Sequence, residues 1–274
     1  MIRVDLSEIL RTKQPELYRR IPRFCIRWIE KLICQKQINN VLERCGDKQG
    51  VPFITSTLDY LKIKRTSVGI EKLRKDGRYI FASNHPLGGL DGFSLAESIE
   101  AYFSSVKLVV NDILMRLTPV ANIFIPINKH GKQSEEYAIG IRKGFDSNTQ
   151  IVYFPAGLCS RLIDGKVTDP TWHKNFINKA IDSKRDIVPT FVDDKNSAFF
   201  YRFALLRKRL KIKANLEMLL LPKELFKKEG KGNIVIYYGE PITYERLINE
   251  ERSAAQWVDY IRNECYKLNP ANKK

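Results

Sequence analysis

The decapeptide SNHPLGGLDG occupies residues 83–92 and overlaps the end of an apolar run, RYIFAS (78–83). It leads into FSLAESIEAYF (93–103), in which apolar side chains recur every three to four residues and predict a helix with one apolar face. The decapeptide itself holds three glycines and a proline. These residues impose a tight backbone path. The sequence therefore predicts a β-strand that passes through a constrained turn into a helix.

His85 and Asp91 flank the first glycines of this turn. Sites of α/β proteins usually lie at the ends of the strands. If the Asp91 carboxylate accepts a hydrogen bond from one ring nitrogen of His85, the other nitrogen can take a proton from an attacking hydroxyl. An alcohol that attacks a thioester directly needs no Ser or Cys nucleophile. The alternative is that His85 only holds the turn by hydrogen bonding, and the turn alone leaves both interpretations open.

Further runs of strand-like composition follow the turn, and helical patterns separate many of them. Most are nearly continuous apolar runs, as expected for strands that are covered on both faces. This alternation predicts an α/β fold with a central mixed, largely parallel sheet flanked by helices, and a last helix over residues 251–268. The strand candidates are VKLVV (106–110), IFIPI (123–127), QIVYF (150–154), DIVPTFV (186–192) and NIVIYYG (233–239).

The first 50 residues are strongly basic and helical in pattern, up to the break GDKQGVP at residues 46–52. Within residues 21–45 apolar side chains recur at helical spacing, and cations occupy the other face. A basic amphipathic helix suits insertion at an anionic membrane interface. The alternative is a helix that packs on the protein's own surface with solvated cations. The predicted membrane-docking residues are Arg20, Arg23, Phe24, Arg27, Trp28 and Lys31.

The 274 residues include 47 Lys and Arg against 31 Asp and Glu, a formal net charge of +16. This surplus favours an anionic partner such as acidic lipid, nucleic acid, a phosphorylated substrate or an acidic carrier protein. The five cysteines form no Cys-x-x-Cys pair, so we expect neither a disulfide framework nor a zinc site. We expect the protein to reside in a reducing compartment. His130 and His173 have no metal-ligand pattern around them. We see no signal peptide and no run of about 18 apolar residues that could span a bilayer.

The turn resembles the first signature of the glycerolipid acyltransferase superfamily, of the lysophosphatidate acyltransferase type, which is written N-H-x4-D. Three later segments resemble the following blocks in the same order. FIPINK (124–129) stands at the acceptor-binding second block, FPAGLCSR (154–161) resembles F-P-E-G-T-R-S, and IVPT (187–190) resembles the fourth block. Together they span residues 78–192, and the basic helices in front resemble the membrane-docking pair of that family.

This chain departs from the family pattern in each of the first three blocks. Five residues rather than four separate the histidine and the aspartate, so we expect a bulged turn if they meet. The third block has Ala156 in place of Glu, with its arginine displaced to Arg161, and the second block offers Asn128 and Lys129 in place of arginine. NHPLGGLDG with FPAG resembles the branch of hemolysin-like acyltransferases and of the O-acyltransferases that make bacterial glycine and ornithine lipids.

The resemblance implies an enzyme that moves a fatty acyl group from acyl carrier protein or coenzyme A to the hydroxyl of a single-chain lipid. The acceptor would be a monoacylated glycine lipid or lysophosphatidate. His85 would be the general base and Asp91 its orienting carboxylate, with no metal and no cofactor besides the thioester. Lys129 and Arg161 would bind the acceptor's acidic group, with solvated surface charges as the alternative. The expected substrate-binding residues are Asn84, Gly88, Gly89, Asn128, Lys129, Phe154, Pro155, Gly157, Ser160 and Arg161.

Two residues of these blocks have a second interpretation. Asn84 holds the turn by local hydrogen bonds or takes part in catalysis. Cys159 has no histidine near it in sequence, so we expect a packing residue rather than a nucleophile.

We expect a membrane-docking segment over residues 1–50 and an acyltransferase domain over 51–274, in a peripheral protein at the cytoplasmic face of the inner membrane. A second basic segment, RFALLRKRLKIK (202–213), would join the docking face or bind an acidic acyl carrier protein. We expect no nucleic acid, because the cations accompany no recognised nucleic-acid-binding signature. The alternatives are a basic nucleic-acid-binding protein, a non-catalytic lipid-binding membrane adaptor on an acyltransferase scaffold, and a thioesterase.

Overall fold

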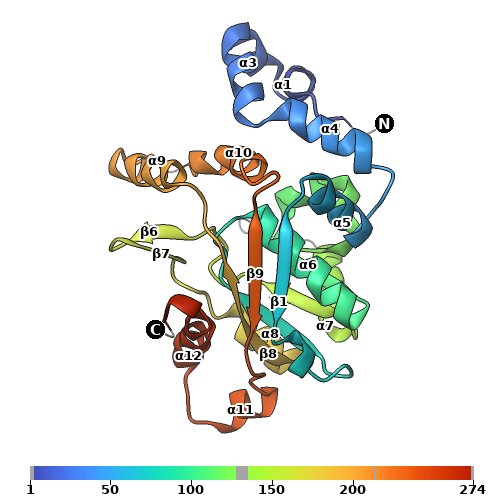
Figure 1. Ribbon diagram of the computed structural model, residues 1–274, viewed down its shortest axis with the longest axis vertical. Helices are drawn as coiled ribbons and strands as arrows, with labels where there is room; N and C mark the ends of the chain where they lie inside the picture. The colour runs from blue at the N-terminus through green and yellow to red at the C-terminus, as the bar shows by residue number, and fades with distance from the viewer. Residues whose placement is uncertain (1–2, 128–134, 213, 273–274) are drawn as a thin grey trace.

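The computed structural model describes residues 3–127, 135–212 and 214–272, and a seven-stranded sheet forms its centre (Figure 1). The strand order is β1-β9-β8-β2-β5-β3-β4. All neighbours are parallel except β8 and β9, so the predicted mixed, largely parallel sheet is confirmed. The strands are β1 (Lys64–Val68), β2 (Tyr79–Ser83), β3 (Val106–Asn111), β4 (Phe124–Ile127), β5 (Gln150–Tyr153), β8 (Asp186–Asp193) and β9 (Asn233–Tyr238), with β6 (Arg161–Ile163) and β7 (Lys166–Thr168) as a separate hairpin.

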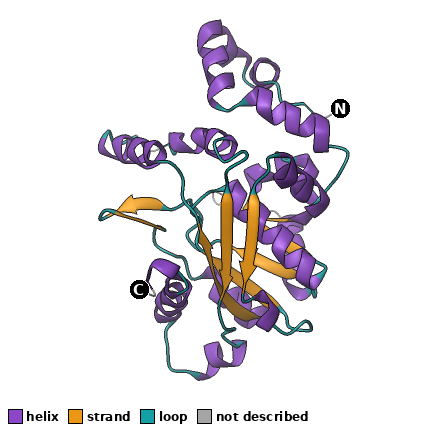
Figure 2. Ribbon diagram, viewed as in Figure 1, coloured by secondary structure: helices purple, strands orange, loops and turns teal. Residues whose placement is uncertain are grey.

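Helices cover both faces of this sheet, because successive side chains of a strand point to opposite faces (Figure 2). On β2, Phe81 belongs to the core under α5 and α6, whereas Ile80 and Ala82 belong to the core under α7, α8 and α12. The helices on the two faces are α5 (Val51–Tyr60), α6 (Gly89–Phe103), α7 (Glu135–Asp146), α8 (Asn175–Ser183) and α12 (Ala254–Lys267), and α11 (Tyr244–Asn249) precedes α12. The six apolar runs predicted as strands are all strands of the sheet.

The parallel strands β2 and β8 end at the same edge of the sheet. From this edge β2 continues into the glycine-rich turn, and β8 continues into α9. Figure 1 shows α9 and α10 at this end of the molecule, together with the N-terminal helices. The elements after β8 are α9 (Ala198–Arg209), the 3-10 helix η4 (Leu216–Leu220) and α10 (Leu221–Phe226); other 3-10 turns are η1 (Ile70–Lys72), η2 (Asp112–Arg116), η3 (Thr118–Ile123) and η5 (Pro270–Asn272).

The N-terminal segment forms four short helices rather than one long one. Ile26 of α3 is buried and Leu32 packs against the cluster around Phe200, which anchors this segment to the rest of the protein. Phe24 and Trp28, on the same helix, are 72% and 63% exposed. The helices are α1 (Leu6–Lys13), α2 (Pro15–Arg20), α3 (Arg23–Leu32) and α4 (Gln35–Cys45). Among the described residues, no helix combines the length and the apolar character needed to cross a bilayer.

Candidate active site

The turn after β2 is shorter than its sequence indicated, because α6 begins at Gly89 rather than at residue 93. Gly88, the residue before the helix, has φ of +80°. A Cβ built on Gly88 would lie 2.8 Å from the Leu221 side chain and 3.2 Å from Sγ of Cys159. Both the backbone conformation and this close approach therefore require glycine.

Asp91 caps the early start of α6 and also contacts His85. Its Oδ2 accepts hydrogen bonds from the backbone N–H groups of Leu87 (2.8 Å) and Gly88 (3.1 Å), the two residues directly before the helix. The same oxygen lies 2.9 Å from Nδ1 of His85. The Asp91 side chain is fully buried, while that of His85 is 17% exposed. The expected bulge is not needed, since the first helical turn carries Asp91 back to His85 across the longer spacing.

The surroundings of His85 make its imidazole strongly basic. Its ring stacks on Phe154 of the third block, with centroids 4.0 Å apart and planes 30° apart. Burial by itself lowers the pKa of His85, but Cys159 and the Asp91 carboxylate outweigh burial and raise the pKa to about 10. Burial raises the pKa of Asp91, although His85 and the two backbone N–H groups oppose that effect. The structure therefore places a basic imidazole next to a buried carboxyl group.

Cys159 is a neighbour of His85 that the sequence analysis did not place there. The thiol is fully buried beside the His85 ring and contributes to raising the pKa of His85. The two segments meet because β5 lies beside β2 in the sheet and Ser160 N–H donates to the His85 carbonyl at 2.7 Å. One sequence signal pointed to this meeting: both blocks directly follow predicted strands, and parallel strands end at a common edge.

Asp169 also escaped the sequence analysis, and it connects the turn to the third block. Its buried carboxylate accepts hydrogen bonds from the backbone N–H of His85 (3.1 Å), from Oγ of Ser160 (2.5 Å) and from Nε1 of Trp172 (2.9 Å). Ser160, an expected substrate-binding residue, is thus hydrogen-bonded within the protein at both its N–H and its hydroxyl. In this arrangement Ser160 fixes the position of the His85 backbone.

The other expected substrate-binding residues divide into buried and accessible ones. The buried Asn84 amide accepts from Val192 N–H (2.7 Å) and donates to the Val192 carbonyl (3.0 Å), which ties the turn to β8. Pro155 is buried as well. Gly89 has no atom within 4 Å of a built Cβ, and Gly157 is exposed with φ of +61°. Substrate binding by these residues stays a prediction. Asn128 and Lys129 lie outside the described residues.

Arg161 belongs to a buried charge cluster. Its Nη2 lies 2.7 Å from Oε1 of Glu217, and its Nη1 donates to the Cys159 carbonyl at 2.7 Å. Nε of Arg207, from α9, lies 2.6 Å from the other oxygen of Glu217, whose side chain is fully buried. Two guanidinium groups thus share one carboxylate, and the cluster keeps a net positive charge next to the third block.

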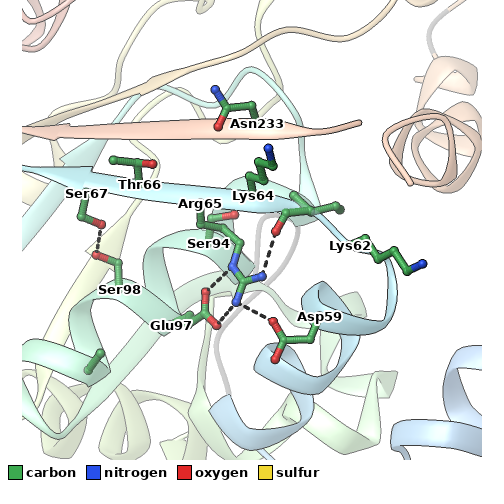
Figure 3. A pocket seen from close by; sticks show the side chains of 12 residues that line it. Asp59, Lys62, Lys64, Arg65, Thr66, Ser67, Ser94, Glu97, Ser98 and Asn233 are labelled. Atoms are coloured by element: carbon green, nitrogen blue, oxygen red, sulfur yellow. Dashed lines mark hydrogen bonds and ion pairs between the residues drawn. The ribbon is translucent and has the colours of Figure 1, made fainter. Parts of the chain in front are cut away.

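A pocket of about 850 Å³ lies away from the turn, between β1 and α6 (Figure 3). Its arginine, Arg65, lies 2.6 Å from Glu97 and 2.9 Å from Asp59. The hydroxyls of Ser67 and Ser98 share a hydrogen bond of 2.6 Å across it. Because these polar groups bind one another, and the predicted site residues that the structure describes lie elsewhere, we assign the candidate active site to the turn.

Comparison with known proteins gives a consistent result over nearly the whole chain. A family model described as acyltransferase matches residues 8–273. A lyso-glycine lipid O-acyltransferase of Bacteroides thetaiotaomicron is 41% identical over 266 residues, which cover 97% of this chain and 97% of that protein. A protein of the same name from Phocaeicola vulgatus is 37% identical over 266 residues, covering 97% of this chain and 95% of that protein.

Among solved structures, the crystal structure of the 1-acyl-sn-glycerophosphate (LPA) acyltransferase PlsC from Thermotoga maritima is similar, with a TM-score of 0.50. The match covers 98% of this chain and 92% of that chain at 13% sequence identity. At this identity the likeness concerns the fold, namely a central sheet flanked by helices.

Proposed function

Because the chain belongs to the acyltransferase family and is an O-acyltransferase enzyme, we propose that it acylates the hydroxyl of a single-chain glycine lipid. The acyl donor is a thioester of acyl carrier protein or coenzyme A. The observation that carries this proposal is the 2.9 Å contact between His85 and Asp91 at the end of β2. The acceptor is chosen because two relatives of matching length are named for lyso-glycine lipid.

In the proposed reaction His85 acts as general base. Asp91 holds Nδ1, so the other ring nitrogen takes the proton of the acceptor hydroxyl while the hydroxyl oxygen attacks the thioester carbonyl. The carbon–sulfur bond then breaks, and the proton on His85 passes to the departing thiolate. No step in this scheme draws on a metal or on a cofactor besides the thioester.

The direct test offers the purified protein one acyl thioester with each of two acceptors, a monoacylated glycine that bears a free hydroxyl and lysophosphatidate. Mass spectrometry then identifies the product. We expect the product to be the diacylated glycine lipid, with the thioester of either acyl carrier protein or coenzyme A as the acyl donor. Free thiol released without any acceptor would instead indicate a thioesterase, and lysophosphatidate as the sole substrate would overturn the proposed acceptor.

We also propose that Arg161 binds the acceptor's carboxylate, supported by the net positive charge of its cluster with Glu217 and Arg207. Arg161→Ala should raise the KM for the acceptor by roughly 10- to 100-fold, since hydrogen bonds to charged groups contribute about 1.5–3 kcal/mol. The KM for the thioester should change much less. Steady-state kinetics check this, with Arg74→Ala, an exposed arginine that pairs with Asp76, as the matched control. An unchanged acceptor KM would remove Arg161 from acceptor binding.

We propose that residues 1–50 dock the acyltransferase domain, residues 51–274, on the cytoplasmic face of the inner membrane as a peripheral segment. The exposed Phe24 and Trp28 would enter the interface, and the neighbouring cations would meet anionic headgroups. The cations concerned, all exposed, are Arg20, Arg23, Arg27 and Lys31.

Flotation with liposomes tests this docking. The protein should float with anionic liposomes and less with zwitterionic ones, and the double variant Phe24→Ser/Trp28→Ser should bind about tenfold more weakly, because it loses two aromatic anchors. A wild-type protein that stays in the soluble fraction even at low salt would refute membrane docking.

A further inference from the structure

Helix α9 carries apolar side chains on two faces, and only one of these faces packs against the protein. Phe200, Tyr201 and Ala204 are buried beneath the helix. On the opposite face Phe199, Leu206 and Leu210 are 55%, 52% and 61% exposed. Apolar side chains that gather on one face of a helix normally pack against another element. The outer face of α9 is therefore an apolar surface without a cover among the described residues.

The exposed side chains lie along one line of the helix, with the half-buried Phe203 among them. Phe199, Phe203, Leu206 and Leu210 follow one another at steps of three and four, so they line up along the helix. The Phe199 and Phe203 rings stack with centroids 6.2 Å apart. The exposed Met218 and Leu219 of η4, which packs against α9, extend this line. We call these six residues the α9 ridge, and exposed apolar side chains gathered in this way mark an interaction site.

The charges around the α9 ridge select an anionic partner. Residues 198–212 contain no acidic side chain. Exposed cations border the ridge along the helix and just beyond its end, namely Arg202, Lys208, Arg209 and Lys211. Apolar side chains bordered by Lys and Arg are the pattern of a helix that lies in the interface of an anionic bilayer.

The α9 ridge lies at the same end of the molecule as the active-site turn. Leu221, directly after η4, is the side chain that a Cβ on Gly88 would meet at 2.8 Å. Leu32 of α3 packs into the cluster that contains Phe200 and Leu220. Figure 1 accordingly shows α9 and α10 at the end of the sheet that also carries α3. The ridge and the exposed Phe24 of α3 therefore belong to one end of the protein.

We propose that the α9 ridge is a second membrane-docking surface, which inserts into an anionic lipid bilayer beside the active-site turn. This inference rests on the proposed function for its lipid acceptor, which such a surface would let the enzyme take directly from the bilayer. An acidic carrier protein would use the cations of α9, but it gives no reason for a bare strip of phenylalanine and leucine.

The first test measures binding of the full-length protein to vesicles of phosphatidylcholine and phosphatidylglycerol. The triple variant Phe199→Ser/Leu206→Ser/Leu210→Ser should bind these vesicles at least about tenfold more weakly than wild type, because three apolar side chains are lost. The control is Ile248→Ser, a residue 57% exposed in α11, and Figure 1 shows this helix at the far end of the molecule. The control should bind as wild type does. Undiminished binding of a folded triple variant would overturn the proposal.

The second test reports insertion without depending on the triple variant. An environment-sensitive dye is placed at Leu210→Cys in a Cys25→Ser background, since the other four cysteines are buried. Its emission should shift to the blue with the anionic vesicles, and not with acyl carrier protein alone. A shift with carrier protein alone, or none with vesicles, would assign the ridge to another partner. Both readouts are independent of acyl transfer, so they stand even if the proposed acceptor proves wrong.

Discussion

Replacing His85 with alanine should lower the rate of acyl transfer by roughly 10²- to 10⁴-fold, the usual contribution of a positioned general base. In wild type the ring is held between the Asp91 carboxylate at 2.9 Å and the Phe154 ring at 4.0 Å, so it is fixed in one orientation for proton transfer. Alanine leaves no group in its place that could take the hydroxyl proton. The measurement is the yield of diacylated lipid at saturating concentrations of both substrates.

The fold should survive this substitution. Asp91 keeps its two hydrogen bonds from the Leu87 and Gly88 backbone, so it is not left without donors. The loss of a partly exposed ring should cost on the order of 1 kcal/mol of unfolding free energy, as for most substitutions. Circular dichroism and thermal unfolding check this. A folded His85→Ala enzyme that still transfers acyl groups would refute His85 as the base.

Cys159 provides the matched variant for this experiment. A thiol beside a histidine that is itself oriented by a carboxylate also resembles the arrangement of covalent catalysis. In direct attack by the acceptor hydroxyl, however, no acyl-enzyme forms. We therefore expect Cys159→Ala to keep its rate within about tenfold of wild type, less than 1.4 kcal/mol in activation free energy. Wild type incubated with acyl thioester alone should show no acyl adduct by mass spectrometry.

The sequence predicted the strands of this fold well because the central strands are covered on both faces. Continuous apolar runs such as that of β8 have few environments other than a buried strand available to them. The edge strand β1 was not predicted, since its segment KRTSV is mostly exposed and its Arg65 pairs with Glu97 and Asp59. The early start of α6 was also missed, because helical apolar spacing says nothing about Gly89 or about a carboxylate that caps the helix.

The candidate site could be predicted only where its residues are close in sequence. His85 and Asp91 share one turn, so spacing and residue type were sufficient to pair them. Asp169 and Glu217 meet their partners from distant segments, and these meetings depend on β2 lying between β5 and β8. No local pattern encodes the order of strands in a sheet. The pairing of Arg161 with Glu217 was accordingly missed, whereas acceptor binding by Arg161 stays a prediction.

Asp91→Asn should lower the maximal rate by roughly 10³- to 10⁴-fold, because an amide can present its NH₂ to the imidazole and favour the wrong tautomer. It should also change the pH dependence. Only a neutral imidazole accepts a proton, so kcat/KM rises with pH through the pKa of His85 in the free enzyme. Burial lowers the pKa of His85, but the effects of Cys159 and Asp91 outweigh that of burial and raise this pKa to about 10. Removing the carboxylate lowers the pKa, so the acidic limb should move to lower pH.

Comparison of two variants separates the effect of Asp91 on basicity from its effect on orientation. Cys159 also raises the pKa of His85, so Cys159→Ala should move the acidic limb in the same direction. The imidazole of that variant still contacts Asp91, so its maximal rate should stay near that of wild type. Profiles of kcat/KM against pH for wild type and both variants supply the measurement. If the limb of Asp91→Asn coincided with that of wild type, the group titrating in the profile would not be His85. If Cys159→Ala lost as much rate as Asp91→Asn, orientation by the carboxylate would no longer explain the loss, and the thiol would have to take part in the reaction.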